Sequence, residues 1–126
     1  VNKNKNRAIS FTSLGQRKYL SVLQFVDAVV GNSSSGLLEA PSFKIGTINI
    51  GKRQDGRMKS KSIIDCDPTK RSISSALKKL FSKDFKETLK SVENPYGDGN
   101  ASSNIIDFLE EVKLPNSIDK KFFDIC

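Results

Sequence analysis

Histidine and tryptophan are absent from the 126 residues, and cysteine occurs only at Cys66 and Cys126. Without histidine, the chain can supply neither imidazole acid–base catalysis nor a histidine-bound zinc ion. The two cysteines lie far apart in the sequence and lack metal-ligand spacing. We therefore expect free thiols, no bound metal and a reducing, cytoplasmic environment.

Long apolar runs are missing as well. No stretch approaches the roughly 20 apolar residues of a membrane span, nor the apolar core of a signal sequence. We therefore expect no membrane partner. The chain starts at Val1 and opens with a polar run, from which we expect a piece of a longer protein.

Acidic residues are scarce in the first half of the chain. The net charge is +7 at pH 7, and residues 1–71 hold 13 basic but only 5 acidic side chains, against 8 and 9 in residues 72–126. This excess indicates an anionic partner for the first half. Few aromatic residues stand among the basic ones, unlike the stacking surfaces and recognition helices of nucleic-acid binders. We expect a small phosphorylated ligand and no nucleic acid.

A turn of small residues follows the apolar run Ala28–Val30, and we call residues 32–36 the serine turn. With its flanks, at residues 31–41, it reads GNSSSGLLEAP. A helix starting here would point backbone N–H groups outward, and three hydroxyls beside them offer a seat for a phosphate. Glu39 lies four residues after Ser35, on the same helix face, where it could accept hydrogen bonds from a sugar diol. The alternative is that the serines only cap the helix and Glu39 is a solvated acid.

Short apolar runs predict strands, and amphipathic spacing predicts helices, along the rest of the chain. We expect strands at residues 8–11, 28–31, 46–50 and 62–65. We expect helices at residues 16–25, after the serine turn as far as Pro41, from an Asp67 cap to Phe81, at residues 83–92 and at residues 102–112. The last helix would turn inward Ile105, Ile106, Leu109 and Val112, and we expect the apolar residues of the tail at 114–126 to dock on another surface. This alternation indicates an α/β domain with a mostly parallel sheet.

Three loops would open on one edge of that sheet, where ligands of parallel sheets bind. They are the loop at residues 12–15, the serine turn and the loop at residues 51–57. Arg53 and Arg57 in the third loop could each offer paired donors to a phosphate. The alternative is that they are solvated loop charges. The coincidence of three loops favours a phosphate or nucleotide site.

Three motifs, taken in order, resemble one enzyme family. They are GNSSSGLLEAP at residues 31–41, TINIGKRQDGR at residues 47–57 and YGDGNA at residues 96–101. They are similar to the UDP-N-acetylglucosamine 2-epimerases, and more narrowly to the hydrolysing branch that releases N-acetylmannosamine and UDP for sialic acid synthesis. The resemblance implies a Rossmann-like three-layer α/β domain. Such a domain forms the second half of a GT-B-type architecture, in which two domains face each other across a cleft.

The resemblance also implies the ligand and its contacts. Residues 1–126 would be the C-terminal part of the domain that binds UDP or UDP-N-acetylglucosamine. Residues 101–126 would form a helix and tail that pack back on a preceding domain, and the complete protein would be a homo-oligomer. The residues that the resemblance brings to UDP are Ser33 and Ser34 at the pyrophosphate, Ser35 and Gly36 completing the turn, Glu39 at the ribose, Arg53 and Arg57 near the phosphates, and Leu14 offering its backbone to the uracil.

The chemistry of the resembling enzymes needs carboxylates and a histidine that they supply from earlier segments. We therefore expect no catalytic residue and no cofactor in this chain, and no activity from this chain alone. Three alternatives remain open. The complete protein could be a nucleotide-sugar glycosyltransferase of the same two-domain fold, a related 2-epimerase acting on UDP-diacetylbacillosamine, or a non-catalytic binding module with a Rossmann-like fold.

Overall fold

The computed structural model describes residue 4 and residues 6–113 of the chain. The chain divides into two compact units, Val1–Tyr96 and Gly97–Cys126. The tail at residues 114–126, for which we predict docking, lies outside the described residues, and so does Cys126.

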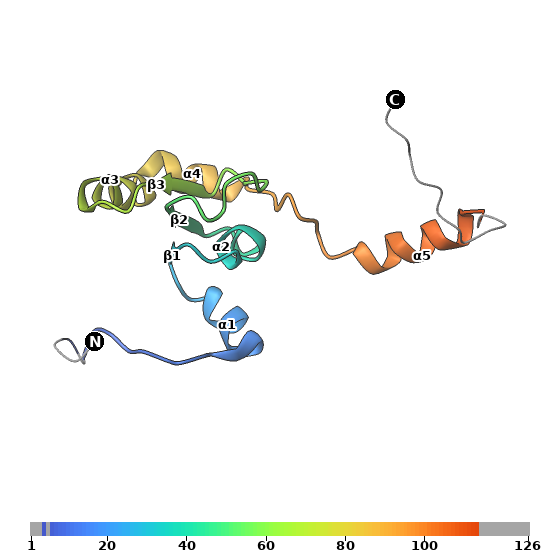
Figure 1. Cartoon of the computed structure of the whole chain (residues 1–126), viewed down its shortest axis with the longest axis horizontal. Helices are drawn as coiled ribbons and strands as arrows, with labels where there is room; N and C mark the ends of the chain where they lie inside the picture. Colours follow the sequence, from blue (N-terminus) through green and yellow to red (C-terminus); the bar gives the residue numbers. More distant parts are fainter. Residues whose placement is uncertain (1–3, 5, 114–126) are drawn as a thin grey trace, which may run out of the picture. The chain divides into compact units, whose positions relative to one another are not determined.

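The first unit is built on a three-stranded parallel sheet in the order β1–β2–β3 (Figure 1). Its strands are β1 Ala28–Gly31, β2 Gly46–Ile50 and β3 Ile63–Cys66. In the register of the sheet, Ile48 pairs with Val30 on one side and with Ile64 on the other. The sequence predicted the first two strands with these bounds and the third with a shift of one residue.

The strand predicted at residues 8–11 is wrong, because these residues lie in no strand. An isolated apolar run becomes a strand only when its backbone groups find a neighbouring strand to bond. Among the described residues no strand pairs with this run, and Ile9 and Phe11 are 76% and 59% exposed.

Helices lie on both faces of the central strand β2. Successive strand side chains point to opposite faces. On one face, Ile48 packs with Ile64 and with residues of α3 Lys70–Leu80 and α4 Lys83–Lys90, namely Ala76, Leu80 and Phe85. On the other face, Thr47 meets the short helix α2 Ser35–Leu38. Helix layers on both sides of a parallel sheet confirm the predicted three-layer, Rossmann-like α/β class.

The remaining helices are α1 Gly15–Leu23, the 3-10 helix η1 Ala40–Phe43 and α5 Ala101–Glu111. Pro41 lies in the first turn of η1, so the chain changes from an α-helix to a 3-10 helix near the predicted break. In the described part of the chain, no helix is long and apolar enough to cross a membrane.

The start of α3 differs from the prediction. The cap is Thr69 rather than Asp67, because Thr69 has extended backbone angles and its side chain accepts a 3.2 Å hydrogen bond from the Ser72 N–H. Pro68 therefore precedes the helix instead of opening it. The backbone N–H of Asp67 donates to the Ser72 hydroxyl at 3.1 Å, which ties the end of β3 to the first turn of α3.

The apolar stripe of α5 is exposed. Ile105, Ile106 and Leu109 are 58%, 55% and 59% exposed, so their predicted inward orientation is wrong for the second unit by itself. Among the described residues of the second unit, α5 has no other helix or strand against which to bury an apolar stripe.

Candidate functional site

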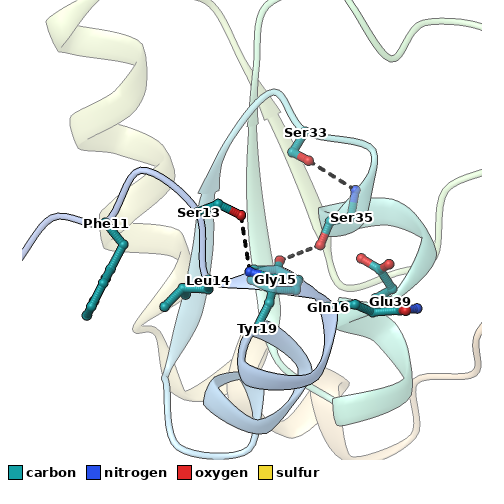
Figure 2. A pocket seen from close by; sticks show the side chains of 9 residues that line it. All are labelled: Phe11, Ser13, Leu14, Gly15, Gln16, Tyr19, Ser33, Ser35 and Glu39. Carbon is teal, nitrogen blue, oxygen red and sulfur yellow. Dashed lines mark hydrogen bonds between the residues drawn. The ribbon is translucent and has the colours of Figure 1, made fainter.

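A cavity of about 690 Å³ lies beside the serine turn, between the start of α1 and the start of α2 (Figure 2). Its lining residues are Phe11, Ser13, Leu14, Gly15, Gln16, Tyr19, Ser33, Ser35 and Glu39. The loop at residues 12–15 thus comes close to the serine turn as the sequence predicts. It does so as the lead-in to α1, however, and not as the end of a strand.

The three serines of the turn have different roles. The Ser33 hydroxyl accepts a 3.3 Å hydrogen bond from the Ser35 N–H, which closes the turn locally. Ser34 is the N-cap of α2, but its side chain makes no capping bond. The Ser35 hydroxyl donates to the hydroxyl of Tyr19, so the turn is fixed to α1 (Figure 2). Helix capping by side chains therefore accounts for none of the three serines, since Ser33 closes a local turn, Ser34 makes no capping bond and Ser35 bonds to α1.

The helix behind the turn has only four residues. The helix dipole grows with length and acts within one turn of the end, so α2 contributes little of the positive potential expected from the sequence. Any anion bound here would depend on hydroxyl and backbone N–H donors and on nearby basic side chains.

Glu39 has an unused hydrogen-bonding atom at the cavity. Its Oε2 is buried and finds no partner among the described residues, and Glu39 lines the cavity together with Ser35 (Figure 2). A buried carboxylate oxygen without a partner is costly, which makes it a strong acceptor for any donor that enters. Two neighbouring hydroxyls of a sugar would supply such donors.

Gly36 lies behind the turn, buried against β2. A Cβ at this position would come 2.6 Å from the Thr47 Cγ2, and the Thr47 hydroxyl donates to the Gly36 carbonyl at 3.0 Å. The absence of a side chain at Gly36 therefore lets α2 approach the sheet closely. This holds the serine turn at the carboxyl end of β1.

Arg53 and Arg57 lie in the loop after β2, and we call residues 51–58 the arginine loop. Both side chains are exposed, and neither lines the cavity beside the serine turn. The two loops are nevertheless joined, because Gln54 Nε2 donates to the Asn32 carbonyl at 2.7 Å. The two loops therefore lie side by side, as the sequence predicts. The guanidinium groups of Arg53 and Arg57, however, do not line the cavity beside the serine turn.

Asp65 binds Lys59, the residue that follows the arginine loop. Its Oδ1 accepts from Asn49 Nδ2 at 2.7 Å, and Lys59 Nζ lies 2.9 and 3.0 Å from its two oxygens. Burial raises the pKa of Asp65, but the hydrogen bonds from Asn49 and Lys59 and the charge of Lys59 outweigh this and leave the pKa below its ordinary value. Lys59 is therefore neutralised locally and is a poor candidate for binding a phosphate.

Two residues of the site were missed from the sequence. Tyr19 falls within the helix expected at residues 16–25, and Gln54 stands between Arg53 and Arg57, and neither position in the sequence indicates a role in a site. Only the fold shows that the Tyr19 hydroxyl reaches Ser35 and that Gln54 reaches Asn32. Within the part of the chain that is described, no group of His, Cys, Asp and Glu could hold a metal ion.

The comparison with known sequences identifies the family. The sequence profile of UDP-N-acetylglucosamine 2-epimerase matches residues 1–110. The chain belongs to the UDP-N-acetylglucosamine 2-epimerase family. This membership confirms the resemblance carried by the three motifs.

Individual relatives agree with the family. The chain is 43% identical over 124 residues to the GDP/UDP-N,N'-diacetylbacillosamine 2-epimerase (hydrolyzing) of Campylobacter jejuni, covering 98% of this chain and 32% of the relative. It is 37% identical over 114 residues to the polysialic acid biosynthesis protein P7 of Escherichia coli, covering 90% and 29%. It is 29% identical over 124 residues to the UDP-N-acetylglucosamine 2-epimerase of Neisseria meningitidis, covering 95% and 32%. The chain thus spans about a third of the length of these curated relatives.

Proposed function

We propose that this chain is the UDP-binding portion of a hydrolysing UDP-N-acetylglucosamine 2-epimerase, which converts UDP-N-acetylglucosamine and water to N-acetylmannosamine and UDP. The observation that carries the proposal is Glu39, which lines the cavity beside the serine turn and whose buried Oε2 has no partner among the described residues. Glu39 lines the same cavity as Ser33 and Ser35, so a ribose diol could meet its carboxylate while the attached pyrophosphate meets the serines. The family membership and the word "hydrolyzing" in the name of the Campylobacter jejuni relative support the reaction.

The cavity supports a division of roles along UDP. Ser33, Ser34 and Ser35, with the backbone at Gly36, would hold the pyrophosphate. Glu39 would accept hydrogen bonds from the ribose hydroxyls, as its unpartnered oxygen suggests. Leu14 lines the same cavity on the α1 side, where its backbone would meet the uracil.

The chemistry sets what the phosphate contacts must achieve. When UDP is eliminated, the bond from C1 to the phosphate oxygen breaks and a proton leaves C2, so negative charge collects on the departing pyrophosphate. Hydroxyl and N–H donors aimed at that charge, and the guanidinium groups of Arg53 and Arg57, would stabilise it. The preceding part of the complete protein would supply the base that takes the proton from C2. It would also position the water that adds to the glycal. The chain alone would bind UDP weakly at most and catalyse nothing.

The second candidate is a hydrolysing 2-epimerase acting on UDP-N,N'-diacetylbacillosamine. The relatives from Campylobacter jejuni and Legionella pneumophila, at 43% and 34% identity, carry this sugar in their names and favour it. The sugar would lie in the cleft with the preceding domain, so the two substrates share every UDP contact proposed above.

The second unit supports a two-domain arrangement. The exposed apolar side chains of α5, including Ile105, Ile106 and Leu109, need a surface to cover them. We infer that residues 101–126 pack back on the preceding domain and that the complete protein forms homo-oligomers in the cytoplasm.

The deciding experiment incubates the complete protein with UDP-N-acetylglucosamine and, separately, with UDP-N,N'-diacetylbacillosamine, without an acceptor. Release of free N-acetylmannosamine together with UDP supports the first candidate, and turnover of the diacetylated sugar alone supports the second. Release of UDP only after an acceptor is added would point to a glycosyltransferase and contradict both. Absence of turnover with UDP binding retained would point to a non-catalytic binding module.

A further inference from the structure

Gln54 connects the arginine loop to the serine turn from inside the fold. The side chain is 2% exposed, and its Nε2 donates to the Asn32 carbonyl at 2.7 Å. Its Oε1 is buried and has no partner among the described residues. Burying an amide oxygen without a partner costs free energy. An amide side chain at position 54 is therefore favourable only if the hydrogen bond that its Nε2 donates offsets this cost. What this bond does depends on the peptide that it holds.

The bond fixes the orientation of the Asn32–Ser33 peptide. A trans peptide is planar, and its C=O and N–H point in opposite directions. No cis peptide occurs in the described part of the chain, so the Ser33 N–H points away from Gln54 when the Asn32 carbonyl points toward it. One buried amide thereby sets the direction of the Ser33 N–H.

The bonds inside the turn do not set this direction. The Ser33 hydroxyl accepts from the Ser35 N–H, and the Ser33 carbonyl accepts from the Gly36 N–H, both at 3.3 Å. Each of these bonds lies after the Asn32–Ser33 peptide. Asn32 itself is exposed, and the turn precedes a helix of four residues that cannot align the peptide by itself.

We propose that Gln54 is a positioning residue for the nucleotide, which holds the Asn32 carbonyl inward so that the Ser33 N–H is presented to the pyrophosphate of UDP. The inference rests on the proposed function and adds a residue that does not touch the ligand. Gln54 acts through the peptide, while Arg53 and Arg57 on either side of it remain at the surface.

The first test measures UDP affinity by calorimetry in the complete protein. Gln54→Met keeps the size of the side chain but cannot donate, and we expect UDP to bind about tenfold more weakly, since a misaligned N–H loses much of a charge-assisted hydrogen bond. Tyr96→Phe is the matched control. It removes another side-chain bond to a backbone carbonyl, from the Tyr96 hydroxyl to Met58 O at 3.0 Å, at the other end of the arginine loop. We expect it to leave UDP affinity within about twofold of the wild type.

Equal losses in the two variants would mean that Gln54 only stiffens the arginine loop, and no loss in Gln54→Met would mean that the peptide needs no support; either result overturns the inference. A wild-type protein that failed to bind UDP would overturn the proposed function as well.

The second test needs no variant and therefore does not depend on folding of a mutant. With 15N-labelled serine, titration of UDP into the wild-type complete protein should shift the Ser33 amide proton downfield, as donation to a phosphate oxygen requires. UDP binding without a change at Ser33 would overturn the inference while leaving the proposed function intact.

Discussion

Gly36 and Thr47 hold the serine turn against the sheet, where α2 packs directly on β2. The Thr47 hydroxyl donates to the Gly36 carbonyl at 3.0 Å, and a Cβ on Gly36 would stand 2.6 Å from the Thr47 Cγ2. Thr47 is 2% exposed, so neither residue has room to move aside. The position of the serine turn therefore depends on the absence of a side chain at Gly36.

Gly36→Ala should destabilise the protein by about 1–3 kcal/mol, the usual cost of forcing one extra carbon into a packed interior. Thr47→Ser removes the Cγ2 methyl and keeps the hydroxyl donor, so it should relieve most of the loss when combined with Gly36→Ala. Denaturant unfolding of the complete protein measures all four combinations. If Gly36→Ala were equally costly with Thr47 and with Ser at position 47, the methyl would not be the obstacle.

The sequence predicts the elements whose signals are local. The runs at residues 28–31 and 46–50 are rich in β-branched residues and are followed by Asn32 and Gly51, and they form β1 and β2 with the predicted bounds. The run at residues 8–11 looks the same locally but finds no partner strand among the described residues. Strand formation depends on a neighbour that a local pattern does not reveal.

The same distinction applies to the site. Ser33, Ser35 and Glu39 are grouped by sequence spacing, and the fold brings them with Leu14 to one cavity. Their contact with UDP stays a prediction, as do the roles of Ser34, Gly36 and the two arginines. Gln54 could not be identified, because its importance comes from a bond across 22 positions to a backbone carbonyl.

Asp65 should make acid unfolding sensitive to its contacts with Asn49 and Lys59. Its pKa is lowered in the folded state, so its ionised form stabilises the fold above the ordinary value of 3.8, and this contribution is lost as the pH falls through the lowered pKa. Its side chain is 54% exposed, so we expect Asp65→Asn to cost less than about 1 kcal/mol at pH 7. Unfolding midpoints of the two proteins, measured from pH 7 to pH 2, should converge at the acid end. A gap that widened toward low pH would contradict the assignment.

Arg53 should matter for its paired donors as well as for its charge. Arg53→Lys keeps the charge but loses the planar fork, and we expect it to weaken UDP binding by about three- to tenfold, with a larger loss for Arg53→Ala. Lys78→Ala, in the last turn of α3, removes the same charge away from the serine turn and is the control for long-range electrostatics. Calorimetry at two salt concentrations measures the three variants. If Arg53→Lys lost no affinity, and Arg53→Ala lost the same affinity as Lys78→Ala and only at low salt, Arg53 would be a solvated loop charge.

Glu39 should discriminate between ribose and deoxyribose. If its unpartnered Oε2 accepts from the ribose hydroxyls, the wild-type complete protein should bind UDP about ten- to a hundredfold more tightly than 2'-deoxy-UDP, which lacks one donor to a charged acceptor. Glu39→Ala should weaken UDP binding and abolish this preference, because both ligands then lack the acceptor. Glu87→Ala, at an exposed acid paired with Lys90, should change neither affinity. If Glu39→Ala kept the full preference for UDP, the ribose would not bind at Glu39. The nucleotide site would then lie elsewhere in the protein.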